Sequence, residues 1–214
     1  MADNLYQQAN SGFTFTIYAA LVSGAVAAVV SSKETSALIY IEKNIDAVLL
    51  FTFIALFNMK TYFDDHKHFG ELYQRDELWE RDVGISLALL SWLFMAISAA
   101  LISSPRNSAI FLVIGIFVSS LWILVHLIEL KRAKGRPQSQ KVIRGLRNNW
   151  FFMNVVYFMI LILYISLPNI NGVDVKVIYM LAITLFLIYD MATSEMTKGV
   201  LPKRSKKDKD SEKI

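Results

Sequence analysis

The residues best suited to chemistry are ionisable side chains that lie inside long apolar runs. His126 and Glu129 lie near the end of one run, and Asp190 lies near the end of another. His126 and Glu129 are three residues apart, so on a helix they share a face. Each ionisable group in hydrocarbon costs about 2.5–3.5 kcal/mol on insertion scales, which requires a compensating interaction. A lined cavity or an ion path is the chemistry that such a set of groups could support.

The same positions recur ahead of three glycines, each of which we expect to end a helix. Gly70, Gly135 and Gly199 are 65 and 64 residues apart, and thirteen residues before each glycine stands an aromatic residue. Polar residues stand nine and six positions before each glycine. This pattern predicts three copies of a two-helix unit, with a polar layer where each second helix leaves the membrane. With Asn154 added for its similar depth, the predicted polar layer comprises Thr61, Asp64, His126, Glu129, Asn154 and Asp190.

Three interpretations of this polar layer stay open. In the structural one, the acids pair with Lys60, with Arg147 or with one another, and fix the register of the bundle. In the functional one, the side chains line a cavity or ion path at the cytoplasmic mouth. In the third, the groups lie at the interface, where long side chains reach water at little cost.

A metal site is only weakly indicated. Asp64, His66 and His68 are metal ligands by type, but Asp64 and His68 share a helix face while Asp65 points elsewhere. The chain has no cysteine, which excludes thiolate ligands and disulfides. Hydrolase motifs are also absent. We therefore expect no metal, no cofactor and no enzymatic activity, and interpret these residues as a solvated helix end.

The elements that position these residues follow from composition. In 214 residues, 55% are hydrophobic and 19% charged, and the mean hydropathy is +0.42, which is typical of an integral membrane protein. We expect an all-α protein with one domain over 1–200 and a disordered basic cytoplasmic tail over 201–214. We expect a short surface helix near 71–82. The six predicted transmembrane helices cover about 13–30, 45–63, 83–103, 108–130, 150–167 and 175–196.

The distribution of basic residues predicts the orientation. Of 22 Lys and Arg residues, 18 lie on the side of the longer connections and both termini. The other four lie at the short turns. Because positive residues remain cytoplasmic, we expect both termini inside, in a plasma or inner membrane. The four residues at the turns are Lys33, Lys43, Arg106 and Lys176.

A basic connection between the fourth and fifth spans is the predicted binding surface for anionic lipid headgroups or for a cytoplasmic protein. Each basic residue near a charged bilayer contributes about 1 kcal/mol. No phosphate-cradling glycine loop or RNA-binding motif accompanies it, so we expect no nucleic acid as a partner. Its residues are Lys131, Arg132, Lys134, Arg136, Lys141, Arg144 and Arg147.

Three two-helix units resemble the mitochondrial carriers in architecture only. That family ends each odd span with Pro-x-Asp/Glu-x-x-Lys/Arg, and the ends at Val30–Ser32, Ser103–Pro105 and Ser166–Pro168 do not fit, so we reject it. The favoured hypothesis is an ion or small-solute channel or transporter, expected to form a homo-oligomer because one six-helix unit leaves little room for a wide cavity. The alternative is a membrane-anchored sensor, adaptor or effector, for example in envelope stress or prokaryotic defence, that recruits a cytoplasmic partner.

Overall fold

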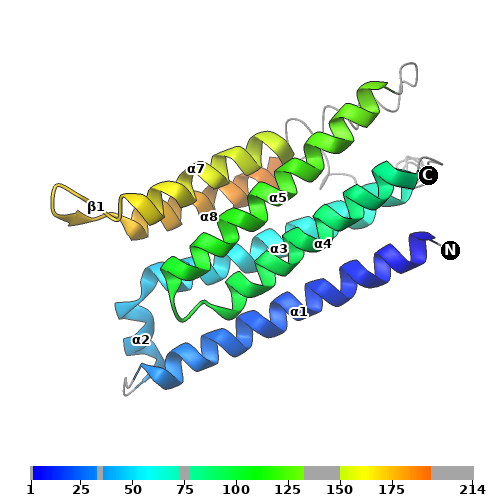
Figure 1. The fold of residues 1–214 in the computed structure, drawn as a ribbon. Coiled ribbons are helices and arrows are strands. Elements are labelled where there is room, and N and C mark those ends of the chain that lie inside the picture. Colours follow the sequence, from blue (N-terminus) through cyan, green and yellow to red (C-terminus); the bar gives the residue numbers. More distant parts are fainter. Residues whose placement is uncertain (1, 33–35, 73–77, 133–149, 194–214) are drawn as a thin grey trace, which may run out of the picture.

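The computed structural model describes residues 2–32, 36–72, 78–132 and 150–193. These residues form a bundle of long helices with one short β-hairpin (Figure 1). The helices are α1 (Ala2–Ser31), α2 (Ala37–Lys43), α3 (Ile45–Leu72), α4 (Leu78–Ala100), α5 (Pro105–Arg132), α7 (Phe152–Ser166) and α8 (Lys176–Thr193), and the strands are β1 (Asn169–Ile170) and β2 (Val173–Asp174).

Within the described residues, three helices are long and apolar enough to cross a membrane. Eighteen residues of helix span about 27 Å, close to the thickness of a bilayer core. These three stretches are Ser11–Ser31, Ile45–Tyr62 and Pro105–Val125, and shorter apolar helices cover Ser86–Ala100 and Phe152–Ser166. Large apolar side chains, including Phe15, Phe117 and Leu185, point outward from the bundle. These features are compatible with a multi-pass, membrane-embedded protein.

The six long helices pack as a ring. The main contacts run from α1 to α4, α5, α7, α8, α3 and back to α1, with smaller contacts of α3 across the ring to α5. The short helix α2, the α4–α5 turn and the β-hairpin lie at one end of the bundle, here called the hairpin end (Figure 1). The chain direction makes α3 and α8 parallel, since both begin at the hairpin end.

The order of helices in the ring bears on the expected repeats. Three equivalent two-helix units around a threefold axis would alternate first and second helices. The observed ring does not alternate, because α1 contacts α4 and α3 contacts α8. The ring thus gives no support to a threefold axis. The three-repeat arrangement rests on the sequence pattern alone.

Several local boundaries differ from the sequence-based expectations. Gly70 does not end a helix, since α3 continues to Leu72. The surface helix expected near 71–82 is not separate within the described residues, because α3 and α4 take up both of its ends. The second apolar run is divided at Asn44, whose amide nitrogen donates to the Tyr40 carbonyl 2.9 Å away. The predicted tail, 201–214, lies outside the described residues.

The turn before α8 is a tight β-hairpin. Asn169 pairs with Asp174 and Ile170 with Val173, in antiparallel register. The central residues Asn171 and Gly172 both have positive φ, 50° and 82°, as an Asn-Gly hairpin turn requires. The hairpin therefore closes the α7–α8 connection in very few residues.

Helices α4 and α5 form the largest helix contact, here called the small-residue seam. Ser98 and Ser108 donate to each other's carbonyl oxygens, both at 2.8 Å, and Ser91 donates to the Gly115 carbonyl at 2.9 Å. On the other side of α4, a Cβ built on Gly24 of α1 would come within 2.8 Å of the Ala99 carbonyl oxygen. Small residues thus let three backbones approach closely without any charge.

Candidate functional site

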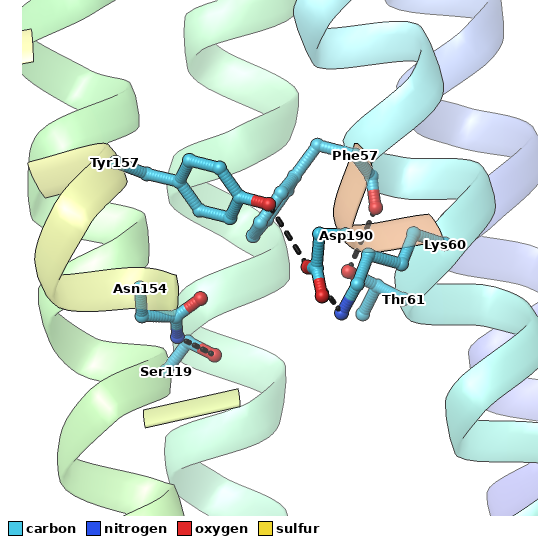
Figure 2. Close-up of polar contacts among 7 residues, drawn as sticks. All are labelled: Phe57, Lys60, Thr61, Ser119, Asn154, Tyr157 and Asp190. Atoms are coloured by element: carbon cyan, nitrogen blue, oxygen red, sulfur yellow. Dashed lines mark hydrogen bonds and ion pairs between the residues drawn. The ribbon is translucent and has the colours of Figure 1, made fainter. Parts of the chain in front are cut away.

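The strongest candidate site is a buried cluster of Lys60, Tyr157 and Asp190. The Lys60 ammonium nitrogen lies 3.4 Å from Asp190 Oδ2, and the Tyr157 hydroxyl donates to the same oxygen at 2.9 Å (Figure 2). The side chains of Lys60 and Asp190 are only 5% and 1% exposed. Both ionisable groups are therefore withdrawn from solvent and from lipid.

Three helices position this cluster. Lys60 comes from α3, Tyr157 from α7 and Asp190 from α8, and α8 contacts both other helices. Aromatic rings fix the tyrosine: Phe53, Phe57 and Phe186 each lie within 6 Å of its ring centroid, in edge-to-face geometry. This aromatic cage holds the Tyr157 hydroxyl at the carboxylate and excludes alternative rotamers.

The lysine has a second partner above the carboxylate. Its ammonium nitrogen lies 4.7 Å from the ring centroid of Trp150, which is a cation–π distance. Trp150 lies just ahead of α7 and is itself buried, and its ring packs 6.0 Å from that of Trp122. The cation is thus held between an acid and an aromatic face.

A small cavity lies near the cluster and shares Trp150 with it, although Lys60, Tyr157 and Asp190 are not among its lining residues. It measures about 20 Å³ and is lined by residues of α3, α4 and α5 together with Trp150. The space has the size of about one water molecule, and its lining is mostly apolar. The buried indole N–H of Trp150 has no hydrogen-bond partner among the described residues and lines this space. The lining residues are Thr61, Ala88, Ser91, Trp92, Met95, Ser119, Trp122 and Trp150.

Three of the six predicted polar-layer residues lie together here. Asp190 belongs to the buried cluster, and Thr61 lines the cavity while its hydroxyl donates to the Phe57 carbonyl of its own helix. Asn154 is also buried, and its amide donates to the Ser119 hydroxyl at 3.4 Å (Figure 2). Ser119 in turn lines the cavity, so the three residues converge on one part of the bundle interior.

The other predicted site residues have side chains outside the described part of the structure. Asp64, His66 and His68 lie in α3, and His126, Glu129, Lys131 and Arg132 lie in α5, with side chains outside the described part of the structure. Five residues of the basic connection lie outside the described residues altogether: Lys134, Arg136, Lys141, Arg144 and Arg147. In the described ranges, no group of three or more His, Asp or Glu residues gathers as metal ligands would.

The sequence interpretation overlooked Tyr157, Trp150 and Ser119 as site residues. One signal was available, because Trp150, Tyr157 and Tyr164 recur every seven residues and so share a helix face. Asn154 and Leu161 complete that buried face of α7. The contribution of Ser119 had no comparable signal, since a single hydroxyl in an apolar helix usually bonds to its own backbone.

The chemistry open to this cluster is proton exchange and ion contact. A carboxylate, an ammonium and a phenol within hydrogen-bonding distance can rearrange their protons without large movements of the helices. The nearby cavity is mostly apolar, with Thr61, Ser91, Ser119 and Trp150 among its lining residues.

Comparisons with known proteins add no identification. A scan against family models, a search of curated proteins and a search of solved structures each found no match. The functional argument therefore depends on the geometry of the chain itself.

Proposed function

We propose that the protein moves a small inorganic ion, with the proton included in that class, across a membrane through the buried cluster of Lys60, Tyr157 and Asp190. In this proposal the six long helices all span the bilayer as three two-helix repeats, with both termini in the cytoplasm, and several copies associate. The observation that carries the proposal is the Lys60–Asp190 pair, buried inside a helical bundle, with Trp150 between Lys60 and a nearby water-sized cavity.

The free-energy cost of burying the Lys60–Asp190 pair indicates a role for it beyond packing. Removing two charges from water costs several kcal/mol for each ion, and apolar replacements of a buried pair are often neutral or stabilising. Among the described side chains, the neighbouring helix contacts are held without charge, by serine, glycine and apolar side chains. A charged pair at one contact is therefore more than this bundle needs for packing.

The size of the cavity limits the substrate. A space of about 20 Å³ excludes organic solutes in this conformation and is no larger than one water molecule or a bare ion. The competing proposal, an adaptor that recruits a cytoplasmic partner, depends on basic segments outside the described residues. The described geometry supports transport more directly.

The test is ion flux in liposomes reconstituted with the purified full chain. Liposomes loaded with a pH-sensitive dye, and parallel sets with sodium- and potassium-sensitive dyes, report which gradient the protein dissipates. We expect wild-type flux of at least one ion several-fold above empty liposomes, and flux equal to empty liposomes for Asp190→Asn.

A matched control separates this effect from the loss of any one carboxylate. Glu42→Gln removes an exposed carboxylate of α2 and should retain wild-type flux. Thermal unfolding of each variant in detergent shows that it is folded at the assay temperature. Wild-type flux in a folded Asp190→Asn variant, or no flux by the wild-type protein, would refute the proposal.

A further inference from the structure

A second cluster of the same composition lies at the hairpin end of the same three helices. Tyr164 of α7 donates to Asp46 Oδ2 of α3 at 3.0 Å. The Lys176 ammonium of α8 lies 4.0 Å from the same oxygen and 3.1 Å from Asp174 Oδ2. We call Asp46, Tyr164 and Lys176 the hairpin-end cluster.

The two clusters are related by an exchange of charge. In the buried cluster α3 supplies the lysine and α8 the aspartate, whereas in the hairpin-end cluster α3 supplies the aspartate and α8 the lysine. In each pair the two residues are the same number of positions apart in the chain. One register of α3 against α8 therefore satisfies both pairs at once, and α7 adds one tyrosine to each cluster.

The clusters differ in burial. Lys176 and Asp46 have side chains 35% and 17% exposed, against 5% and 1% for Lys60 and Asp190. The Asp46–Lys176 distance is also longer, and Lys176 divides its charge between two carboxylates. The hairpin-end cluster is thus the weaker and more accessible of the two.

An apolar layer separates the clusters. About four helical turns, or roughly 21 Å, lie between the charged residues along both α3 and α8. Fully buried apolar residues in between include Leu50 and Phe53 of α3, Leu161 of α7 and Ile183 of α8, and the stretch also holds the buried polar residues Asn58 and Thr184. The contact between α3 and α8, here called the α3–α8 seam, is therefore closed to water in its middle. A polar cluster lies at each end of it.

From this arrangement we infer that the hairpin-end cluster is a latch, which closes the α3–α8 seam on that side and controls access of a small ion to Asp190. This inference rests on the proposed function for its purpose, but the latch itself is a structural claim. Separation of α3 and α8 at the hairpin end breaks the exposed pair and opens the apolar layer, while the buried pair stays formed. The weaker cluster is the one that opening disrupts first.

A single-cysteine accessibility experiment tests the latch. The native chain has no cysteine, so Ile183→Cys introduces one thiol into the apolar layer. The purified full chain in detergent is treated with a charged thiol reagent, which needs no assumption about membrane orientation. The labelling rate is compared in the wild-type, Lys176→Ala, Asp46→Asn and Lys176→Arg backgrounds.

We expect Lys176→Ala and Asp46→Asn to raise the labelling rate by up to about fivefold, the shift that an exposed ion pair can produce. Lys176→Arg keeps the charge and should leave the rate unchanged. Leu112→Cys in α5 is a matched control, since it is fully buried, lies seven residues from the hairpin-end start of its helix as Ile183 does, and is not in this seam.

Three results would overturn the inference: an unchanged rate at Ile183→Cys, an equal rise at Leu112→Cys, or a rise with Lys176→Arg. If Ile183→Cys does not fold, Leu50→Cys on the facing helix serves in its place. The labelling rate is measured independently of ion flux, so the two claims can fail separately. Labelling as expected in a protein that conducts no ion would support the latch and refute the proposed function.

Discussion

The small-residue seam between α4 and α5 and the contact between α3 and α8 solve the same packing problem with different chemistry. The first uses serine hydroxyls bonded to backbone carbonyls, and Gly115 of α5, which admits the α4 backbone. The second uses two lysine–aspartate pairs with tyrosine donors. Among the described side chains, the α4–α5 contact needs no charged pair, so the charges at the α3–α8 contact call for a further explanation.

The difference also indicates which contact can move. Hydroxyl and glycine contacts depend on close, continuous approach and are lost together when the helices separate. The charged contact is concentrated at two points with an apolar layer between them. It can open at its weaker point while the stronger one holds, as an access pathway requires.

The largest expected effect comes from breaking the buried pair. Lys60→Met leaves Asp190 buried beside Tyr157 without its cation, and should cost about 3–5 kcal/mol of unfolding free energy. The double variant Lys60→Met with Asp190→Leu removes both charges and should lose far less. Denaturant unfolding in detergent micelles measures both. Additive losses in the double variant would show that the two residues do not act as a pair.

The next effect tests the uncharged side. Gly24→Ala places a Cβ 2.8 Å from the Ala99 carbonyl oxygen and 2.9 Å from Ile102, so α1 and α4 must separate. We expect a loss of about 1–3 kcal/mol, in the range of overpacked sites. Gly12→Ala in the same helix has nothing within 4 Å and should be neutral or stabilising. Equal thermal midpoints for the two variants would contradict close packing at Gly24.

A smaller effect is expected from one inter-helix hydroxyl. Ser98→Ala removes a hydrogen bond from α4 to the Ser108 carbonyl and should cost about 1 kcal/mol, within the range measured between membrane helices. Ser120→Ala removes a bond to the Ile116 carbonyl of its own helix and should change the unfolding free energy much less. The small-residue seam would be wrongly described if Ser120→Ala were the more destabilising of the two.

The smallest effect concerns pH at the hairpin end. The backbone N–H of Lys176 donates to Asp174 at 2.9 Å, which holds the pKa of that exposed carboxyl below its usual value. Because the folded pKa is the lower one, its stabilising contribution is present above the unfolded pKa and is lost as pH falls through the folded pKa. Asp174→Asn should slightly flatten the acidic side of a stability–pH profile. An unchanged profile would argue against this hydrogen bond in solution.

The sequence predicted the helices well and their neighbours poorly. Long apolar runs placed the helices, because hydrophobicity acts locally, although α5 begins at Pro105 and not at the predicted residue 108. Gly70 was misjudged as a helix end, since glycine stops a helix only where the chain adopts the left-handed cap. The order of the helices in the ring depends on side-chain fit between segments that are distant in the sequence. Local sequence patterns do not reveal this fit.

The same distinction applies to the candidate site: some of its residues were identifiable from the sequence, and others follow only from helix packing. Asp190 and Asn154 were identifiable because a charge or an amide in an apolar run is costly wherever the helix packs. Lys60 was named only as one of several cations that could pair with the acids. Its selection follows from the parallel packing of α3 on α8, and the role of Trp150 follows from the entry of the chain into α7.

The central claim is that the buried pair serves ion movement and is dispensable for folding. The most direct measurement is ion flux by the double variant Lys60→Met with Asp190→Leu, reconstituted in liposomes beside the wild-type chain. Our account predicts a folded protein with flux equal to that of empty liposomes. Wild-type flux through a folded, uncharged variant would contradict it.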